Sequence, residues 1–319
     1  AENSTTVTVT VKKVPTEITV DPASLDLFVG DETVIVATLT PSDAGNVSFK
    51  SSDDSIVIVD NKGNIIANGK GQAIITVSFA GDNKYAESEN KTITVDVSLN
   101  DASVSVDNDT LDLNVDERYQ INATRHPDTI LLEITYKSSN NTVATVDENG
   151  VVTALGEGTA IITLSVGDGE IYAENSTNVT VTVKKVNANM DVSANEISEG
   201  ENATITVTLP SDATGNVNTT FNGKTYSSEV KDGKAVITVP DLLKGDYTLP
   251  IIYSGDDKYN PLTKDLNITV EGGKAIISAP DLVKYYSGPE RFTVNLTYAK
   301  GSPAANTPVN ITINGVTYP

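Results

Sequence analysis

Apolar and polar residues alternate at period two along much of this chain. The clearest stretches are 7–11 (VTVTV), 93–97 (ITVDV), 179–183 (VTVTV), 205–209 (ITVTL) and 294–298 (VNLTY). Such alternation predicts β-strands with one buried and one wet face. Threonine suits the wet face because its branched Cβ favours an extended backbone. We find no stretch with the period of an amphipathic helix over three turns.

Turn-forming residues separate these stretches at intervals of about eight to twelve residues, which is typical of a β-sandwich or barrel. The candidate turns are 60–63 (DNKG), 147–150 (DENG), 222–223 (NG), 232–233 (DG) and 314–315 (NG). Asn-Gly and Asp-Gly pairs favour tight hairpins because both residue types tolerate positive φ. The pattern therefore predicts an all-β fold.

Segments of the chain recur at an interval of 87 residues. The stretch 69–76 (GKGQAIIT) returns as 156–163 (GEGTAIIT), and 85–87 (YAE) returns as 172–174. A third unit keeps part of the spacing, because 255–259 (GDDKY) lies 174 residues after 81–85 (GDNKY). This period is too long for one turn of a solenoid and suits a whole small sandwich. Each repeat is therefore expected to be a separate domain with its own core.

The two ends of the sequence predict incomplete domains. Residues 1–13 (AENSTTVTVTVKK) differ from residues 173–185 (AENSTNVTVTVKK) at one position, and the second copy ends a repeat. We therefore expect 1–13 to be the last strand of a preceding domain. Residues 274–319 suffice for about half a domain. The linkers around 98–101, 184–187 and 271–274 are short, so we expect domains end to end in a rod on the order of 120–150 Å long.

Composition and charge exclude several classes of protein. The 319 residues contain no Cys and one His, so no disulfide, Cys-ligated zinc or thiol nucleophile can form. The net charge is -21, whereas nucleic-acid grooves need a basic surface. No run of 18 apolar residues is present, so we expect no membrane span. The chain does not open on a signal peptide, and we expect any anchor to lie outside this segment.

Two motifs carry a family resemblance. The stretch 138–147 (SSNNTVATVD), followed by 150–160 (GVVTALGEGTA), resembles the bacterial Ig-like group 2 domain, and 51–60 (SSDDSIVIVD) is a weaker copy. Residues 187–270 are similar to another bacterial Ig-like repeat. Residues 274–319 resemble the first half of a related module through 284–286 (KYY), Pro303 and 306–309 (NTPV). The mixture resembles adhesin-like surface proteins of gut methanogenic archaea.

The predicted fold is therefore a set of tandem Ig-like β-sandwich domains in an elongated array. The predicted parts are 1–13, the last strand of a preceding truncated Ig-like domain; 14–97 and 100–184, two group 2 domains; 187–270, an Ig-like domain of a second type; and 274–319, the N-terminal half of a further Ig-like domain. We refer to 14–97, 100–184 and 187–270 as the first, second and third repeats.

Thirteen Asn-x-Ser/Thr sequons are the candidate modification sites. Several fall in alternating stretches, where residues i and i+2 share the wet face and are accessible to a glycosyltransferase. The alternative is that Asn and Thr are simply the polar half of this pattern. The possible N-glycosylation sites are Asn3, Asn46, Asn90, Asn108, Asn122, Asn140, Asn175, Asn178, Asn202, Asn218, Asn267, Asn295 and Asn310.

The other residues that could form a functional site can also be explained by a purely structural role. The acidic loops at 53–54, 60–61, 82–83 and 256–257 could bind Ca²⁺, but none has the spacing of a dedicated calcium loop, and Asx-capped turns with solubilising charge are the favoured interpretation. Tyr85, Tyr172 and Tyr259 suit core packing under a loop. A covalent Lys–Asn cross-link, or an ester through Gln72 or Gln120, stays open. His126 precedes Pro127 and reads as a loop residue. We therefore predict no catalytic, metal or cofactor site.

The expected function is that of a non-enzymatic fragment of a cell-surface adhesin or stalk, in which rod-like Ig-like repeats project or present binding modules. The expected partner is a protein or glycan on a host or neighbouring cell, without nucleic acid, and the rod is expected to be monomeric. The expected location is extracellular and anchored at the cell surface. The alternative is a spacer, or carbohydrate- or cell-wall-binding modules, of a surface-anchored enzyme.

Overall fold

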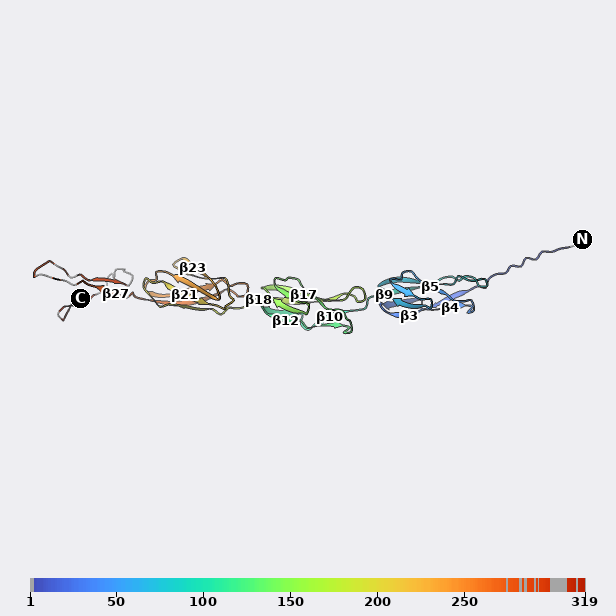
Figure 1. The fold of residues 1–319 in the computed structure, drawn as a ribbon, viewed down its shortest axis with the longest axis horizontal. Helices are drawn as coiled ribbons and strands as arrows, with labels where there is room; N and C mark the ends of the chain where they lie inside the picture. The colour runs from blue at the N-terminus through green and yellow to red at the C-terminus, as the bar shows by residue number, and fades with distance from the viewer. Residues whose placement is uncertain are drawn as a thin grey trace. The chain divides into compact units, whose positions relative to one another are not determined.

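Among the residues that it describes, every regular element of the computed structural model is a β-strand, as the alternation predicts (Figure 1). The structure describes residues 3–273, 275–280, 283, 286–289, 291, 293–298, 309–313 and 315–318. The motif residues Lys284, Tyr285, Pro303 and 306–308 lie outside these ranges, as does Asn314 of one predicted turn. No helix capable of crossing a bilayer occurs among the residues described.

The first repeat forms three small sheets. A four-stranded sheet has the order β2-β9-β8-β5, a three-stranded sheet the order β3-β7-β6, and β1 pairs with β4. Strand β2 is parallel to β9, and the other described pairs are antiparallel. The strands are β1 (Glu17–Asp21), β2 (Ser24–Phe28), β3 (Glu32–Val34), β4 (Val36–Thr40), β5 (Ser48–Ser51), β6 (Val57–Val59), β7 (Asn64–Ala67), β8 (Gly71–Ser78) and β9 (Lys91–Ser98).

The second repeat has the same arrangement, strand for strand. Its sheets have the orders β11-β18-β17-β14, β12-β16-β15 and β10-β13. The strands are β10 (Ser103–Val106), β11 (Thr110–Asn114), β12 (Arg118–Gln120), β13 (Ala123–His126), β14 (Thr135–Ser138), β15 (Ala144–Val146), β16 (Val151–Ala154), β17 (Gly158–Val166) and β18 (Asn175–Lys184). The sequence repeat is thus a repeat of topology as well.

The third repeat builds two larger sheets. Their orders are β19-β21-β24 and β20-β26-β25-β22-β23. The strands are β19 (Asp191–Ala194), β20 (Ile197–Ser198), β21 (Ala203–Thr208), β22 (Asn216–Phe221), β23 (Lys224–Glu229), β24 (Lys234–Val239), β25 (Gly245–Tyr253) and β26 (Leu262–Glu271). Here β24 runs antiparallel to β21 over the whole length of that strand.

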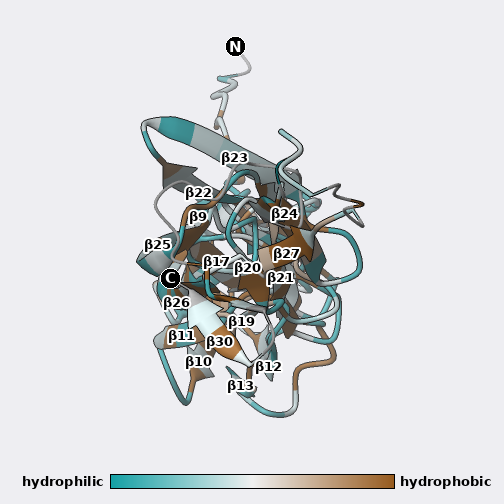
Figure 2. Ribbon diagram, turned by 90° about the vertical axis from the view of Figure 1, so that its left-hand side faces the viewer, coloured by the Kyte–Doolittle hydropathy of each residue, from teal (hydrophilic) through white to brown (hydrophobic). Residues whose placement is uncertain are grey.

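Each repeat has buried apolar residues on the inward positions of its strands. In the first repeat Ile75 of β8 pairs with Ile93 of β9, and both are fully buried. In the second, Ile162 and Val181 are fully buried, and in the third Ile205 and Tyr253. Apolar colour concentrates on the strands and hydrophilic colour on the connecting loops (Figure 2). Period-two alternation therefore separates core from solvent in each sandwich.

The predicted turns lie between strands where the structure describes them. Gly63 and Gly150 have φ of 83° and 80° and close the β6–β7 and β15–β16 hairpins. In the third repeat, Asn222-Gly223 joins β22 to β23, and Asp232 and Gly233 precede β24, all with positive φ. Positive φ is the conformation for which Gly and Asn are selected in tight hairpins.

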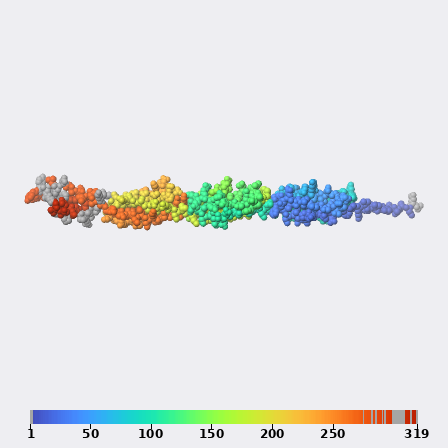
Figure 3. All heavy atoms as spheres, turned by 90° about the horizontal axis from the view of Figure 1, so that it is seen from below, coloured from blue at the N-terminus to red at the C-terminus, as the bar shows by residue number. Residues whose placement is uncertain are grey.

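The segments outside the three repeats carry little regular structure. Residues 3–13 form no strand, and their side chains are exposed, with Val7, Val9 and Val11 at 80–89%. Figure 3 draws this segment in dark blue, continuing from the first repeat. Toward the C-terminus the strands are β27 (Ala275–Ser278), β28 (Asn295–Tyr298), β29 (Ile311–Ile313) and β30 (Val316–Tyr318). They form two hairpin-like pairs, β27-β28 and β29-β30.

Candidate functional site

The Gly-Asp loops that lead to Tyr85, Tyr172 and Tyr259 are built as Asx turns, in which an aspartate caps its own loop, and the second loop is one residue longer than the other two. Asp82 Oδ1 accepts hydrogen bonds from the amides of Lys84 and Tyr85, at 2.7 and 2.6 Å. The amides of Tyr85 and Lys84 thereby lower the pKa of Asp82. Asp168 accepts from three amides, including that of Tyr172 at 2.8 Å, and its pKa is also lowered. The sequence suits this turn because Asp hydrogen-bonds to backbone a few residues ahead.

Asp256 in the third loop is the most completely satisfied carboxylate. Its Oδ1 accepts from the amides of Lys258 and Tyr259, at 2.9 and 2.7 Å. Its Oδ2 accepts from the amide and hydroxyl of Thr214 and from the hydroxyl of Tyr253, at 2.7, 3.1 and 3.0 Å. Burial alone would raise the pKa of Asp256, but these donors outweigh it and lower the pKa to about 2. The carboxylate is thus held ionised as a structural acceptor.

The tyrosine of each loop fastens the chain where it enters the repeat. Val14, Asn100 and Val186 form isolated parallel bridges to Tyr85, Tyr172 and Tyr259. In the first repeat the amide of Val14 donates to Lys84 O and the amide of Ala86 donates to Val14 O, both at 2.9 Å. The same pair of bonds recurs in the other two repeats. The motif therefore has a structural function that sequence spacing alone did not reveal.

Two of the three tyrosines are buried as predicted, and their hydroxyls have a carboxylate partner. Tyr85 is 4% exposed and donates to Asp43, whereas Tyr259 is 7% exposed and donates to Asp212 at 2.9 Å. Lys84 and Lys258 pair with the same two carboxylates at 3.2 and 2.7 Å. The stretches that carry these acids, 41–44 and 210–213, are both PSDA.

The prediction of a core tyrosine is only partly right for the second repeat. Tyr172 is half-buried. The corresponding stretch, 127–130, reads PDTI, so Thr129 stands where the other repeats have an aspartate. Glu170 and Ile171 precede the tyrosine where the other loops have a lysine. The acid and the lysine are thus replaced together, and the tyrosine loses its buried anchor.

The aspartates of the other acidic loops, Asp53 and Asp60, also cap turns through their carboxylates. Asp53 accepts from the amide and hydroxyl of Ser55 at 2.9 and 2.6 Å, and these bonds lower its pKa. Asp60 accepts from Asn64 and Lys62, and the side chain of Asn64 is the main cause of its lowered pKa. Within the described ranges, no group of three or more His, Cys, Asp or Glu side chains is placed to hold a metal ion.

The residues considered for catalysis or cross-linking lie in unremarkable surroundings. His126 is the last residue of β13 and not a loop residue; it is exposed, with Nε2 3.5 Å from Ser105 Oγ. Gln72 donates to Asp96 at 2.8 Å, and Gln120 donates to the carbonyls of Ile121 and Asn149. Since neither glutamine has a threonine hydroxyl among these partners, the geometry of an ester cross-link is not formed.

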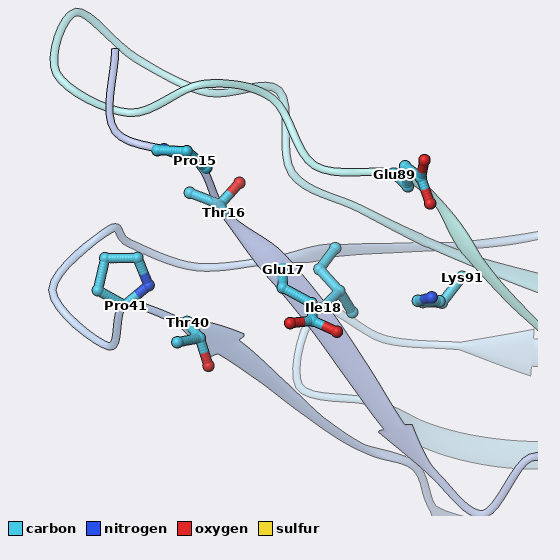
Figure 4. Close-up of a pocket in the computed structure, with 8 residues that line it drawn as sticks. All are labelled: Pro15, Thr16, Glu17, Ile18, Thr40, Pro41, Glu89 and Lys91. Carbon is cyan, nitrogen blue, oxygen red and sulfur yellow. The ribbon is translucent and has the colours of Figure 1, made fainter. Parts of the chain in front are cut away.

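A shallow groove of about 420 Å³ lies at the ends of β1 and β4, opposite residues 89–91 (Figure 4). Figure 4 shows Thr40 and Pro41 on one side and Glu89 and Lys91 on the other. Glu17 and Glu89 are its only acids. Catalytic sites pair a nucleophile or acid with an orienting partner; this groove brings together no such constellation.

The sequons lie almost entirely on the surface. Twelve of the thirteen asparagines are exposed, and Asn218 on β22 is half-buried. Asn122 and Asn310 come just before β13 and β29, while Asn267 and Asn295 lie within strands. Asn140 caps a turn through Thr142, whose hydroxyl donates to Asn140 Oδ1 at 2.7 Å. The amide nitrogen of Asn140 therefore faces away from the bond that its oxygen accepts.

Family models match all three repeats. Bacterial Ig-like domain (group 2) matches residues 14–93 and 102–173, and bacterial Ig-like domain (group 3) matches residues 190–271. The chain contains tandem bacterial Ig-like domains. Ig-like domains are β-sandwiches, which agrees with the sheets of the three repeats.

Two curated relatives match this chain over part of their own length. Ice-binding protein 1 of Shewanella frigidimarina is 29% identical over 182 residues, which are 54% of this chain and 20% of that protein. An uncharacterized protein of Clostridium acetobutylicum is 29% identical over 157 residues, 48% of this chain and 16% of that one. The chain thus spans about a fifth of the length of these curated relatives.

Solved structures that match most of this chain at low identity include the following two. Surface layer protein SbsC, domains 1–6, is 20% identical, with a TM-score of 0.27 over 94% of this chain and 48% of that one. Drosophila N-cadherin EC1–3 is 15% identical, with a TM-score of 0.26 over 72% of this chain and 90% of that one.

Proposed function

We propose that this chain is a non-enzymatic part of a cell-surface adhesin or stalk, in which Ig-like repeats project or present binding modules. The observation that supports it best is the threefold recurrence of one device: each sandwich has its own core, and the chain entering it is bridged to its tyrosine loop. Short linkers and bridged entry points suit a chain that holds spacing between its ends.

The proposed location is extracellular, at the cell surface, with the anchor outside this segment. The mixture of repeat types supports an archaeal adhesin-like protein. The partner is a protein or glycan of a host or neighbouring cell, and the chain itself acts as a monomer. The net charge of -21 keeps a crowded array soluble and mutually repelling. We do not propose ice binding for this chain, because the match covers only 20% of the Shewanella ice-binding protein.

Surface labelling tests the location. Antibodies raised against this segment are expected to label intact cells of the source organism as strongly as permeabilised cells. Labelling that requires permeabilisation would contradict a surface location.

Binding assays on glycan arrays and on cells test the spacer role. Residues 100–184 are expected to give no saturable binding, because a spacer repeat contributes no ligand-binding site of its own. Saturable binding by this repeat would contradict a passive role.

We further propose that exposed sequons are N-glycosylated in the native host. Intact mass and peptide mapping of protein purified from that host are expected to show glycans at several of the twelve exposed asparagines and none at half-buried Asn218. The same protein made in a host without glycosylation provides the reference mass. Unmodified peptides at every sequon would refute this part of the proposal.

A further inference from the structure

In the first repeat, one edge of a long strand has a hydrogen-bonded partner strand over only half of its length. The stretch from Glu32 to Thr40 alternates exposed and buried side chains without a break, yet it changes partner at Ile35. Before Ile35, β3 pairs with β7; after it, β4 pairs with β1. The amide of Ile35 donates to Gly63 O at 2.8 Å, in the turn where the β6–β7 hairpin ends.

The free edge of β4 follows from this geometry. Successive amides of a strand point to opposite sides, so the amides of Ala37 and Leu39 point to the same side as that of Ile35. The hairpin has ended there, and the described backbone hydrogen bonds include none to this side of β4. An open edge with free donors and acceptors is a template for one more strand.

The third repeat shows what fills this place in a complete sheet. Its strand β21 pairs with β19 on one edge and with β24 on the other, with Ala203–Thr208 opposite Lys234–Val239. In the first repeat β4 corresponds to the part of β21 that pairs with β19, and the place of β24 is empty. A strand with the alternating pattern of β24 therefore has the shape to complete the sheet.

A groove of about 830 Å³ runs along the open edge. Residues 34–39 form one side, residues 45–49 form the other, and Asn61 and Lys62 stand at the hairpin end. Leu39, which is 7% exposed, and the half-buried Phe49 present apolar surface to it. Such a groove accepts one extended chain, whose alternate side chains would cover these two residues.

We propose that this groove binds one extended polypeptide segment of another protein, which adds to β4 as an antiparallel strand. Main-chain hydrogen bonds to Ala37 and Leu39 provide the register, and apolar residues at alternate positions pack on Leu39 and Phe49. The inference goes beyond the stalk role and does not depend on it, because it concerns the first repeat alone.

Charge indicates which segment fits. In a chain with 43 acidic residues, Lys62 is the only charged residue lining this groove. The corresponding groove of the second repeat, beside β13, is lined by Arg125, Asp128, Glu133 and Glu148. Its Arg125 donates to Leu132 O at 2.7 Å and ties down the adjoining loop. The first groove therefore suits a segment that has no charged side chain where it covers Leu39 and Phe49 and carries a negative charge at its C-terminal end, which the antiparallel direction places near Lys62.

The test uses the whole chain and a peptide with the sequence of residues 232–239 (DGKAVITV), labelled at its N-terminus and ending in a free carboxylate, which the antiparallel direction places near Lys62. Binding is measured by fluorescence anisotropy. A control peptide carries Val236→Pro and Ile237→Pro, which remove one amide on each side of the strand. Saturable binding of the first peptide and at least tenfold weaker binding of the control are expected.

Two substitutions with matched controls locate the site. Ala37→Pro removes an amide that faces the groove and is expected to weaken binding at least tenfold, whereas Ala123→Pro at the same place in the second repeat changes it less than twofold. Lys62→Glu, in an exposed turn that tolerates the change, is expected to weaken binding severalfold, and Asn149→Glu to have no effect. Circular dichroism checks that each variant folds.

Absence of saturable binding would overturn the proposal, as would binding that neither Ala37→Pro nor Lys62→Glu weakens. Sedimentation of the chain alone provides a further outcome. A dimer that Ala37→Pro dissociates would show that a second copy occupies the edge, and the proposal would then be wrong.

Discussion

At the scale of single residues, this protein uses carboxylates to order loops. Asp82, Asp168 and Asp256 each accept amides of their own loop, and Asp43 and Asp212 each accept a tyrosine hydroxyl. A hydrogen bond to a charged acceptor contributes about 1.5–3 kcal/mol when it is protected, and less at an exposed position. The loops are thereby ordered without metal ligands, disulfides or large aromatic clusters.

The tyrosine hydroxyl in the third repeat is expected to contribute measurably to stability. Tyr259→Phe removes the 2.9 Å bond to Asp212 but keeps the ring, so we expect a loss of about 1 kcal/mol. Tyr172→Phe, at a half-buried tyrosine in a repeat without that aspartate, is expected to change stability by less than about 0.5 kcal/mol. Hydrogen exchange in β25 and β26, compared with β17 and β18, measures both effects. Equal losses from the two variants would contradict the assignment of Asp212 as the anchor.

Asp256 is expected to make the third repeat sensitive to acid. Its pKa is about 2 in the folded chain and about 3.9 in an unfolded one. The stabilisation from this ionised carboxylate is therefore complete above pH ~4 and is lost as the pH falls toward 2. Calorimetry between pH 5 and pH 2 is expected to show the transition of the third repeat falling, with a smaller decrease in Asp256→Asn. An unchanged pH dependence in the variant would contradict this role.

At the scale of elements, alternation located strands well but not their partners. The stretches 93–97, 179–183 and 205–209 lie in or overlap β9, β18 and β21, since their side chains divide between core and water. Residues 7–11 carry the same pattern and form no strand, because a strand needs a neighbour to accept its hydrogen bonds. The open edge of β4 could not be predicted from the alternation either, because it depends on where the β6–β7 hairpin ends. The Asx turns, by contrast, follow from local residue type.

Gly63, in the turn of the β6–β7 hairpin, is expected to be required for the stability of the first repeat, because the carbonyl of Ile35 lies close to it. A Cβ on Gly63 would lie 2.3 Å from Ile35 O, at a φ of 83°. We therefore expect Gly63→Ala to destabilise the first repeat by roughly 2–4 kcal/mol, the sum of strain and displacement of β3. Gly30 in the same repeat has a φ of 90° with nothing within 4 Å of the added carbon.

Gly30→Ala is thus the matched control, with an expected cost of about 1–2 kcal/mol from backbone strain alone. The second repeat already has Asp116 at the corresponding place, with a φ of 73°. Calorimetry of the two variants measures the difference. A cost for Gly30→Ala equal to that for Gly63→Ala would show that the Ile35 carbonyl plays no part.

At the scale of the whole molecule, the chain builds a β-sandwich three times along its length. Each repeat buries its own apolar residues, and the fold class could be predicted from period-two alternation together with the 87-residue repeat. The difference between the second repeat and the other two could not be predicted from the sequence. It lies in contacts between distant residues, such as the acid of the PSDA stretch and the tyrosine about 42 residues later.

Small-angle X-ray scattering of the intact chain tests the central claim of a projecting array most directly. A rod on the order of 120–150 Å long, as strand length and short linkers predict, has a radius of gyration of roughly 35–43 Å and a pair-distance distribution with a long tail. A compact chain of this length would have a radius of gyration of about 20 Å. The first result is the one that the proposed stalk role predicts, and the second would contradict it.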